Sequence, residues 1–574
     1  MNNKIMKKIF KEIALFKSLL AICMGVLVGA CETTELDLRV SPNNLASDQG
    51  DPNLLLNSIQ LAYATNQQQI ANLGAQLTRI DYMFGRDYFN NFPGSTLNGI
   101  WSRTYSSGFN GAGNINIQLG IFTNLQTLEQ INSDSEIDYS FHVGVGKVLL
   151  AHSLFQLIDY VGEAAFSEAG QPLEFPSPRL DSGEEVYQAA FTLLDEAEAF
   201  LSLDPPSQGA QDQFYQGDSA KWVKLINSIR LRSYKNTENT AAFNAIIAGG
   251  NYIVDAADDF QLPYGTSELQ PDDRHPDFIT GYTPSGVSAP RALSSGYQSN
   301  WLMELMLENN DPRIRYYFYR QQNATPGADA PPNEETLVCS TAVPPQHYQD
   351  GGFTYCSVPN GYWGRSHGND EGGPPDNFLR TAVGVYPAGG RFDDDGFDVV
   401  GLGLGGAGAG IEPIILSSYI EFWRGEMAAN DTERANFLRS GLEKSIAKVQ
   451  SFGSLDASAD LSFEPDADEV TNYINTIVSD FNNATGDDKE NIYAEQYFTS
   501  LYGGATEAYN YYRKTGYPNT VLPNWEPDPG PFPRTFLLPQ NEVVNNPNLT
   551  QRSDLNTQVF WDTNPASPAF PPAN

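Results

Sequence analysis

The chain has few basic residues, few histidines and few cysteines for its 574 residues. Lys and Arg together number 34 against 70 Asp and Glu, which gives a formal net charge of −36. Because phosphate contacts need Lys or Arg, this balance argues against nucleic-acid binding. The five histidines include no HExxH sequence, so the pattern of a zinc hydrolase is missing as well.

Hydrophobic runs are also scarce, and the one at the N-terminus has the layout of an export signal. Five lysines among the first 17 residues form a basic region, and residues 18–29 form a short apolar run that ends in small residues. Val-Gly-Ala directly before Cys31 is typical of a bacterial lipoprotein signal, in which cleavage leaves Cys31 as the first residue with lipid on its thiol. The alternative is an ordinary signal peptide with an incidental cysteine.

These features predict three parts of the chain. We expect residues 1–30 to be a signal peptide, residues 31–50 a lipidated polar tether, and residues 51–574 a single domain. Removal of five lysines and one glutamate with the signal takes the net charge from −36 to −40. We identify no second hydrophobic run of transmembrane length, so the acyl chains on Cys31 would supply the anchor.

Two cysteines besides Cys23 and Cys31 remain to be explained. Cys339 and Cys356 form one pair across a short loop, and in an exported protein such a pair indicates a disulfide. A metal site is the alternative, but it needs two more ligands, and a single histidine, His347, lies between the cysteines.

Helical periodicity dominates the chain after residue 50. Trp222, Leu225, Ile226 and Ile229 recur at helical spacing, and Asp218 is placed to cap the first turn. The tryptophan in this pattern, like Trp423 further on, is predicted to belong to the core. Further helices are predicted at 139–161, which is apolar on more than one side, at 186–201, at 416–427, at 435–449 with Asp431 as a candidate cap, and over roughly 468–513.

Long stretches rich in aromatic residues, glycine and proline separate these helices. They cover about 84–110, 257–297, 323–410 and 515–574. Loops of that length are usually functional or disordered, and disordered tails normally lack the Trp and Tyr residues found here. We therefore predict a mostly α fold, with long ordered loops over a helical scaffold.

Seven blocks of sequence occur in an order that is typical of one protein family. They are DPNLLLNSIQLAYA, HSLFQLIDYVGEAAFSEA, KWVKLINSIRLRSY, DPRIRYYFYRQ, GYWGRSHGNDEGGPPDNFLRTAVGVYPAGGRFDDD, EPIILSSYIEFWRGEMA and EAYNYYRKTGYP. Together with the small residues before Cys31, they resemble the SusD/RagB outer-membrane nutrient-binding lipoproteins, specifically the SusD-like branch.

The resemblance implies TPR-like helix pairs that form a scaffold for large ligand-presenting loops. It also implies a lipid-anchored protein of the outer membrane, exposed at the cell surface of a Bacteroidetes-type bacterium. Members act as a lid over a SusC-like TonB-dependent transporter and capture oligosaccharides, or in some cases peptides, for import. A binding protein without catalytic residues is therefore expected.

One stretch raises the question of catalysis, because residues 364–368, Gly-Arg-Ser-His-Gly, match the G-x-S-x-G nucleophile elbow. That motif needs a helix directly after the serine. The residues after Ser366 are HGNDEGGPPDN, whose glycines and two prolines exclude a helix. We therefore predict a binding or structural loop and no catalytic serine.

Asp393, Asp394, Asp395 and Asp398 are the candidates for a metal site. Their oxygens could hold a structural Ca²⁺, which prefers carboxylates and carbonyls. Their spacing is not that of an EF-hand, and a solvated acidic loop is the alternative. Apart from this calcium, no cofactor is expected.

A glycine-rich run at 401–410, GLGLGGAGAG, superficially suggests a dinucleotide loop. It lacks the βαβ context and the downstream acid that such a loop needs. We predict a flexible loop that leads into a helix beginning near Glu412.

Aromatic residues in polar, glycine-rich loops are the remaining candidates for function. Sugar C–H faces stack on such rings, while amides, carboxylates and Arg hydrogen-bond the hydroxyl groups. The alternative is that these rings hold the long loops against the helices. Trp363 is the first candidate, because Gly361 and Gly364 flank it and a polar partner follows. The predicted ligand-binding residues are Trp363, Tyr362, Arg365, Tyr82, Phe89 and Trp101.

The sequence thus predicts a lipoprotein that captures an oligosaccharide or peptide and delivers it to a SusC-like TonB-dependent transporter. The alternative is a surface-tethered glycoside hydrolase beside an uptake system, which needs two carboxylates at a defined separation in a cleft. A structural or adhesive surface protein is a third, weaker possibility.

Overall fold

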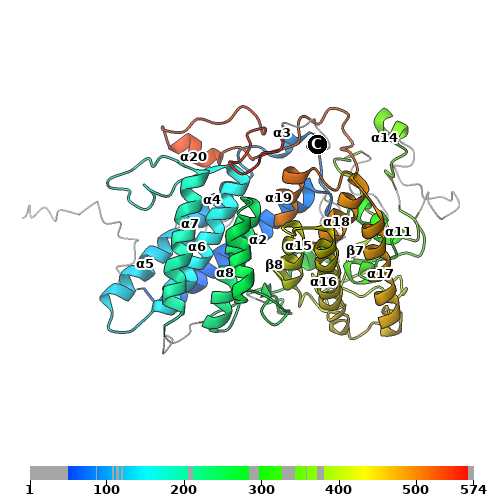
Figure 1. Ribbon diagram of the computed structural model, residues 1–574, viewed down its shortest axis with the longest axis horizontal. Coiled ribbons are helices and arrows are strands. Elements are labelled where there is room, and N and C mark those ends of the chain that lie inside the picture. Colours follow the sequence, from blue (N-terminus) through cyan, green and yellow to red (C-terminus); the bar gives the residue numbers. More distant parts are fainter. Residues whose placement is uncertain are drawn as a thin grey trace, which may run out of the picture. The chain divides into compact units, whose positions relative to one another are not determined.

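Helices account for most of the regular structure (Figure 1). The computed structural model describes residues 50–565 except 86, 106–108, 111–115, 118–119, 204–210, 270, 283–295, 326–342, 357 and 372–379. The predicted signal peptide and tether, with Cys31, lie outside the described residues, as does Cys339. The chain divides into two compact units, Met1–Gln49 and Gly50–Asn574, and the described residues belong to the second.

The helices follow the order that the sequence predicts, with short additional helices in the long loops. They are α2 (Pro52–Leu77), α3 (Tyr88–Asn91), α4 (Asn98–Tyr105), α5 (Ile121–Asp134), α6 (Ser140–Val161), α7 (Gly183–Leu201), α8 (Ser219–Asn236), α9 (Thr240–Gly249), α10 (Pro276–Tyr282), α11 (Asn300–Glu308), α12 (Ile314–Tyr317), α14 (Gln346–Gly351), α15 (Ser417–Glu426), α16 (Asp431–Gln450), α17 (Ala467–Asn483), α18 (Asp487–Ser500), α19 (Thr506–Thr515) and α20 (Gln540–Asn545), with 3-10 turns η3 (Gly453–Leu455) and η4 (Leu461–Phe463).

Helices that follow one another in the chain pack as pairs. Contacts join α5 to α6, α6 to α7 and α7 to α8, and further along they join α15 to α16, α16 to α17 and α17 to α18. Figure 1 shows each of these series side by side. Helix α2 packs against α5, α6 and α19. The predicted mostly α, TPR-like scaffold of helix pairs is therefore confirmed.

Helix α6 is the most deeply buried of these elements. All of its 22 residues are buried, in contact with α2, α5, α7 and α8. Its length and apolar composition would suffice to cross a membrane, so the expectation that no second run of this kind follows the signal was wrong. Its burial is what residues 139–161 predict, because a helix that is apolar all round packs between others.

The helix starts show how local sequence determines these elements. Asp218 caps α8 as predicted, accepting hydrogen bonds from the backbone N–H of Ala220 at 3.0 Å and of Lys221 at 3.3 Å. The predicted cap of α16 was wrong by one residue. Asn430, rather than Asp431, accepts from the Glu433 N–H at 3.0 Å. As predicted, Trp222 and Trp423 are fully buried.

Strands in the described part of the chain are short and form antiparallel pairs. They are β1 (Phe109–Asn110) with β2 (Asn116–Ile117), β3 (Glu163–Ala164) with β4 (Asp181–Ser182), β5 (Phe260–Pro263) with β8 (Ile411–Ile415), and β6 (Phe318–Tyr319) with β7 (Ala382–Val383).

Strand β8 corrects one prediction, because Glu412 lies in this strand and not in a helix. The pair with β5 places Glu412 opposite Leu262, and every residue of β8 is buried. Three isoleucines suit a strand, since β-branched side chains favour extended backbone. The helix that the sequence places near Glu412 begins at Ser417.

The glycine-rich run 401–410 is also better defined than predicted. The Gly406 N–H donates to the Gly390 carbonyl and the Gly408 N–H to the Gly389 carbonyl, both at 3.0 Å. A Cβ atom on Gly405, whose φ is +65°, would overlap the Gly390 carbonyl oxygen. These glycines allow two backbone segments to approach closely, so the interpretation as a flexible loop was wrong.

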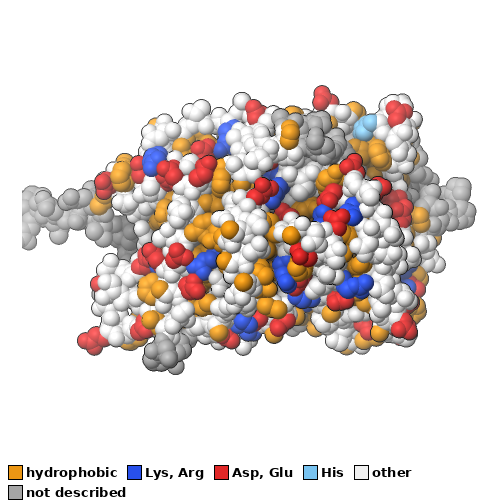
Figure 2. Space-filling model, in the orientation of Figure 1, with side chains coloured by type: hydrophobic (Ala, Val, Ile, Leu, Met, Phe, Trp, Pro, Cys, Tyr) orange, Lys and Arg blue, Asp and Glu red, His pale blue; other side chains and the backbone are white. Residues whose placement is uncertain are grey.

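The surface carries the acidic charge of the composition. On the face in Figure 2, Asp and Glu side chains are spread over the molecule, and Lys and Arg side chains are interspersed among them. Because the carboxylates repel anions, a surface of this kind favours cationic or neutral ligands.

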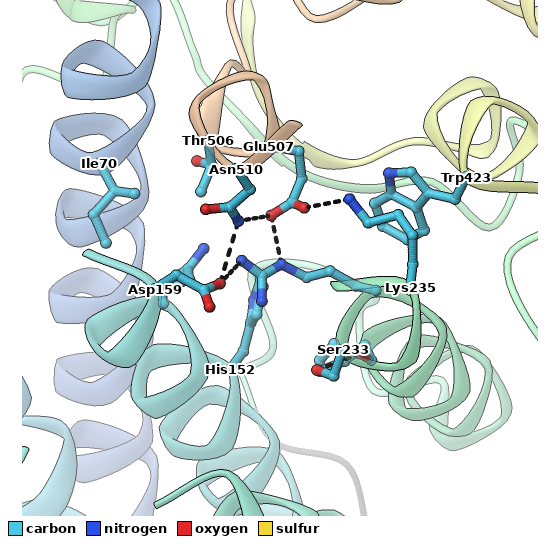
Figure 3. Close-up of polar contacts among 12 residues, drawn as sticks. Ile70, His152, Asp159, Ser233, Lys235, Trp423, Thr506, Glu507 and Asn510 are labelled. Atoms are coloured by element: carbon cyan, nitrogen blue, oxygen red, sulfur yellow. Dashed lines mark hydrogen bonds and ion pairs between the residues drawn. The ribbon is translucent and has the colours of Figure 1, made fainter. Parts of the chain in front are cut away.

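A buried ionic network joins α6, α8 and α19. Figure 3 shows Lys235 pointing toward Glu507, and Asn510 between Glu507 and Asp159. Arg232 forms an ion pair with Asp159, and its Nε donates to Glu507 Oε1 at 2.6 Å. Burial alone would raise the pKa of Glu507, but the charges of Arg232 and Lys235 lower it below its usual value. Trp561 lies in the C-terminal segment, and its indole N–H donates to Asp159 Oδ1 at 2.9 Å. This hydrogen bond links the C-terminal segment to the network.

We expect Gly74→Ala to destabilise the protein where α2 crosses the start of α19. A Cβ atom there would clash with the Ala505 carbonyl oxygen and lie 3.0 Å from Tyr160 Oη. Overpacking of this kind costs about 1–3 kcal/mol, and a rigid backbone contact favours the upper part of the range. That exceeds the roughly 1 kcal/mol that Ala gains over Gly in a helix interior. Urea unfolding measures the difference.

The matched control is Gly249→Ala in α9, where an added Cβ atom has nothing within 4 Å among the described residues. We expect this variant to be as stable as the unmodified protein or more stable. Equal stabilisation by both substitutions would contradict the close approach at Gly74.

Candidate functional site

A cavity of about 540 Å³ lies beside the C-terminal half of α2, and we refer to it as the α2 cavity. Its walls come from residues 68–76 of α2, the segment 80–92, α10, β8 and the residues that precede α19. Segments far apart in the sequence therefore meet here. The lining combines amide side chains, aromatic rings and carboxyl groups.

The amides come from one stripe of helix α2. Gln68, Asn72 and Gln76 follow one another at four-residue spacing, which places them on the same side of a helix, and all three line the cavity. Their amides make no hydrogen bond to any other residue that the structure describes. Each can both donate to and accept from a ligand hydroxyl.

The aromatic rings come from the loops around the helix. The hydroxyl of Tyr82 donates to the Asn369 carbonyl at 2.6 Å, and the hydroxyl of Tyr502 donates to Gln298 Oε1 at 2.9 Å, so both rings are fixed in place. Phe84 is 43% exposed and offers a free ring surface. The rings that line the cavity are Tyr82, Phe84, Phe92, Tyr297 and Tyr502.

Three carboxyl groups, those of Asp81, Asp277 and Glu412, complete the lining. Glu412 is 2% exposed, and burial raises its pKa well above the usual value, to which the charge of Asp277 adds. Burial raises the pKa of Asp81 to about 7, although the Tyr82 N–H donates to its Oδ1 at 2.7 Å. Among the described residues that line the cavity, none is Lys, Arg or His.

The structure distributes the predicted ligand-binding residues over different environments. Tyr82 lines the α2 cavity. Trp101 is buried in α4 with its ring centroid 4.8 Å from that of Tyr105, and it does not border the cavity. Phe89 is 50% exposed in α3 but does not border the cavity either. Contact between these residues and a ligand stays a prediction.

Trp363 is the main correction to the predicted site. Its side chain is 2% exposed and packs in one cluster with Tyr82, Tyr297 and Cys356. The flanking glycines therefore do not hold its ring out toward solvent, and contact between Trp363 and a ligand stays a prediction. A Cβ atom on Gly364 would overlap the Gln298 carbonyl oxygen, so this glycine permits close backbone packing and buries its neighbour.

The residues next to Trp363 are buried as well. The Arg365 guanidinium lies over the Tyr297 ring, 4.7 Å from its centroid, and Arg380 lies over the same ring at 4.0 Å. Tyr362 is 3% exposed, with the Arg320 guanidinium 4.9 Å from its centroid. These contacts correspond to the alternative in which aromatic residues hold loops in place.

Ser366 is 1% exposed, and its hydroxyl lies 3.2 Å from the carbonyl oxygens of Thr354 and Tyr355. Its geometry is that of a hydroxyl that donates to backbone carbonyls. No helix follows it within residues 367–371, as the sequence predicts. The structure therefore gives this serine a packing role.

Cys356 is buried beside Trp363 and is disulfide-bonded. Its predicted partner, Cys339, lies outside the described residues, so the pairing stays a prediction.

A second cavity, of about 1030 Å³, is bordered by Arg315, Arg320, Tyr362 and Asp395. Both of its arginines already pair with one of its carboxylates. Arg315 NH1 lies 3.0 Å from Asp395 Oδ1, and Arg320 is also paired with that carboxylate. Because these charges are satisfied, the α2 cavity is the better candidate for a ligand site.

Three of the four aspartates that the sequence proposes for calcium are likewise paired with arginines, whereas Asp394 accepts from the backbone N–H groups of Gly396 and Asp460. Arg320 Nε donates to Asp393 Oδ2 at 2.6 Å, and Arg391 NH1 lies 3.4 Å from Asp398 Oδ2. In the part of the chain that the structure describes, no group of three or more His, Cys, Asp and Glu residues could hold a metal ion. Calcium at Asp393, Asp394, Asp395 and Asp398 stays a prediction.

Paired helices that support a polar, ring-lined cavity define a helical binding protein of the TPR-like class. The family model of SusD-like proteins, described as starch-binding associating with outer membrane, matches residues 42–330. The chain belongs to the SusD-like family. No curated protein sequence matches the chain.

Solved structures of similar fold cover almost the whole chain. A chitin-binding protein is 18% identical over 90% of this chain and 100% of its own, with a TM-score of 0.59. A SusD/RagB family protein from Bacteroides thetaiotaomicron is 16% identical over 91% and 99%, with a TM-score of 0.59. A chitin-binding SusD homolog from Flavobacterium johnsoniae is 16% identical over 90% and 100%, with a TM-score of 0.53. At these identities the likeness shows the fold.

Proposed function

We propose that this protein binds an oligosaccharide in the α2 cavity. The observation that carries the proposal is the stripe of Gln68, Asn72 and Gln76, whose unengaged amides face a cavity that also exposes the ring of Phe84. Sugar hydroxyls are hydrogen-bonded by amides, and sugar C–H faces pack on aromatic rings. The names of two structural relatives, a chitin-binding protein and a chitin-binding SusD homolog, support a carbohydrate ligand.

We further propose that the protein is lipid-anchored through Cys31 at the outer membrane, exposed at the cell surface, and passes its ligand to a SusC-like TonB-dependent transporter. The family description, which includes association with the outer membrane, supports the location. The order of basic region, apolar run and small residues before Cys31 supports the anchor. The transporter follows from family resemblance alone.

A glycoside hydrolase is the alternative function, and one observation favours it. Asp81, Asp277 and Glu412 line the same cavity, and a carboxyl with a raised pKa can serve as a general acid. We propose capture without cleavage, because the matching family is described by its binding.

The test is calorimetric titration of the full-length protein, purified in detergent, with a panel of oligosaccharides and peptides. Each mixture is then analysed for cleavage products. Binding of an oligosaccharide that is recovered intact supports the proposal. Cleaved ligand would establish the hydrolase, and binding confined to peptides would overturn the choice of carbohydrate.

We expect Phe84→Ala to weaken binding of the best oligosaccharide by about 1–2 kcal/mol, or about tenfold in Kd. The ring lines the cavity and is 43% exposed, so its removal takes away ligand contact and little packing. Calorimetry measures the affinity, and thermal unfolding should be unchanged.

Phe89→Ala is the matched control. It removes a ring of similar exposure, 50%, that does not border the cavity. If the ligand binds in the α2 cavity, affinity and stability should be unchanged, whereas the sequence-based prediction that Phe89 contacts the ligand requires weaker binding. Equal weakening by both variants would place the site elsewhere.

A further inference from the structure

The described lining of the α2 cavity is acidic. Asp81, Asp277 and Glu412 all line it, and the described residues of the lining include no Lys, Arg or His. The guanidinium groups of Arg365 and Arg380 lie over the Tyr297 ring and do not belong to the lining. A neutral sugar would leave the buried carboxyl groups protonated, whereas a cationic ligand would pair with their ionised forms.

Glu412 is the most informative of the three acids. It is 2% exposed, yet its carboxyl makes no hydrogen bond or ion pair to any described residue. Buried carboxyl groups in proteins are normally paired, because an unpartnered one is costly. A buried acid that lines a cavity and has no partner among the described residues suits a ligand that supplies the partner.

We propose that the α2 cavity selects an oligosaccharide with protonated amino groups, such as an oligomer of glucosamine, with Glu412 and Asp81 as the counter-ions. The proposal rests on the proposed function, an oligosaccharide in this cavity, and adds the chemical class of that oligosaccharide. The ammonium groups would balance the acids, and the hydroxyl groups would use the amide stripe of α2.

Two further observations favour an amino sugar. The rings and free amides of the cavity suit the faces and hydroxyl groups of a sugar, whereas a lysine side chain would use the acids alone. The acidic surface seen in Figure 2, together with the net charge of −36, would also attract a cationic ligand and raise its association rate.

Binding of an ammonium group should release protons from the protein. Burial raises the pKa of both Asp81 and Glu412, and the groups around Glu412 that interact with it are Asp277, Tyr264 and Tyr419. A nearby cation favours the ionised carboxylate and lowers these pKa values. Protons therefore leave when the ligand binds, and titrations in buffers of different ionisation enthalpy count them.

The experiment compares glucosamine oligomers with N-acetylglucosamine oligomers of equal length, on the full-length protein at about pH 5.5, roughly two units below the pKa of an ordinary α-amino group. We expect the amine oligomer to bind at least about tenfold more tightly, as for hydrogen bonds to charged groups, and with proton release. The N-acetylated oligomer should bind without proton release.

Glu412→Gln should abolish the preference for the amine oligomer over the N-acetylated one. The matched control is Glu443→Gln, an exposed acid on α16 that does not line the cavity, for which we expect an unchanged preference. If Glu412→Gln does not fold, Asp277→Asn serves instead. Its side chain is 49% exposed, and the preference should fall in that variant too.

Three results would overturn the inference. Equal or tighter binding of the N-acetylated oligomer would refute amine selection while leaving the proposed function intact. Tighter binding of a trilysine peptide than of the glucosamine oligomer would assign the acids to a peptide. No binding of any oligosaccharide in the panel would refute the proposed function itself.

Discussion

We expect Arg232→Ala to lower the free energy of unfolding by about 3–5 kcal/mol. Arg232 is 1% exposed and pairs with two carboxylates, Asp159 and Glu507, that are also buried. Truncation leaves both carboxylates buried without the positive charge and the hydrogen bonds that Arg232 supplies. Lys235 pairs with Glu507, with its Nζ 3.2 Å from Oε2, but it does not pair with Asp159 and therefore cannot replace both contacts. Urea unfolding measures the loss.

The matched control is Arg230→Ala, two residues away on the same helix. Arg230 pairs with Asp195 and Glu198, whose side chains are 73% and 37% exposed. Exposed pairs contribute about 0–1 kcal/mol, so we expect a small loss. Similar losses from the two variants would show that the buried network contributes no more than a surface pair.

The pH dependence of the loss separates electrostatics from packing. In the unmodified protein the charges of Arg232 and Lys235 lower the pKa of Glu507, against the raising effect of burial. A depressed pKa contributes stability above the ordinary value of 4.5, and this contribution disappears as the pH falls through the folded value. The deficit of Arg232→Ala should therefore be full at neutral pH and shrink in acid. A deficit independent of pH would indicate lost packing alone.

The helical scaffold could be predicted because it depends on local patterns. Apolar residues at helical spacing identify α7 and α8, and the apolar stretch 139–161 identifies a helix inside the bundle, observed as α6. Strand β8 could not be found in this way. Its sequence, IEPII, is a short apolar run that fits a helix or a strand, and its partner β5 lies about 150 residues earlier in the chain.

The candidate site was predicted less well than the fold, for physical reasons. The sequence shows that a residue is aromatic but not whether its ring is buried. Glycines beside Trp363 can allow close backbone packing as readily as they can support an exposed ring. The stripe of Gln68, Asn72 and Gln76 is visible in the sequence as amides at four-residue spacing, and that signal was missed. The isolation of Glu412 could not be seen, because it depends on which residues surround β8 in space.

Trp363→Ala tests the revised role of the residue that the sequence ranked first. We expect a loss of about 3–5 kcal/mol in the free energy of unfolding, as for other buried tryptophans replaced by alanine. The ring is 2% exposed and meets Tyr297 edge to face at 6.1 Å. The backbone on either side is held by Thr381, whose Oγ1 accepts from the Trp363 N–H at 2.7 Å. Thermal and urea unfolding measure the loss.

The same variant connects packing to the ligand site. Tyr82 and Tyr297 line the α2 cavity and pack on Trp363 from the other side, so a void behind them would let both rings shift. Oligosaccharide affinity should therefore fall together with stability, and Trp363→Phe, which keeps a ring, should recover part of both. An exposed ligand anchor would behave differently, with weakened binding at unchanged stability. That outcome would restore Trp363 as a contact residue and contradict its burial in this cluster.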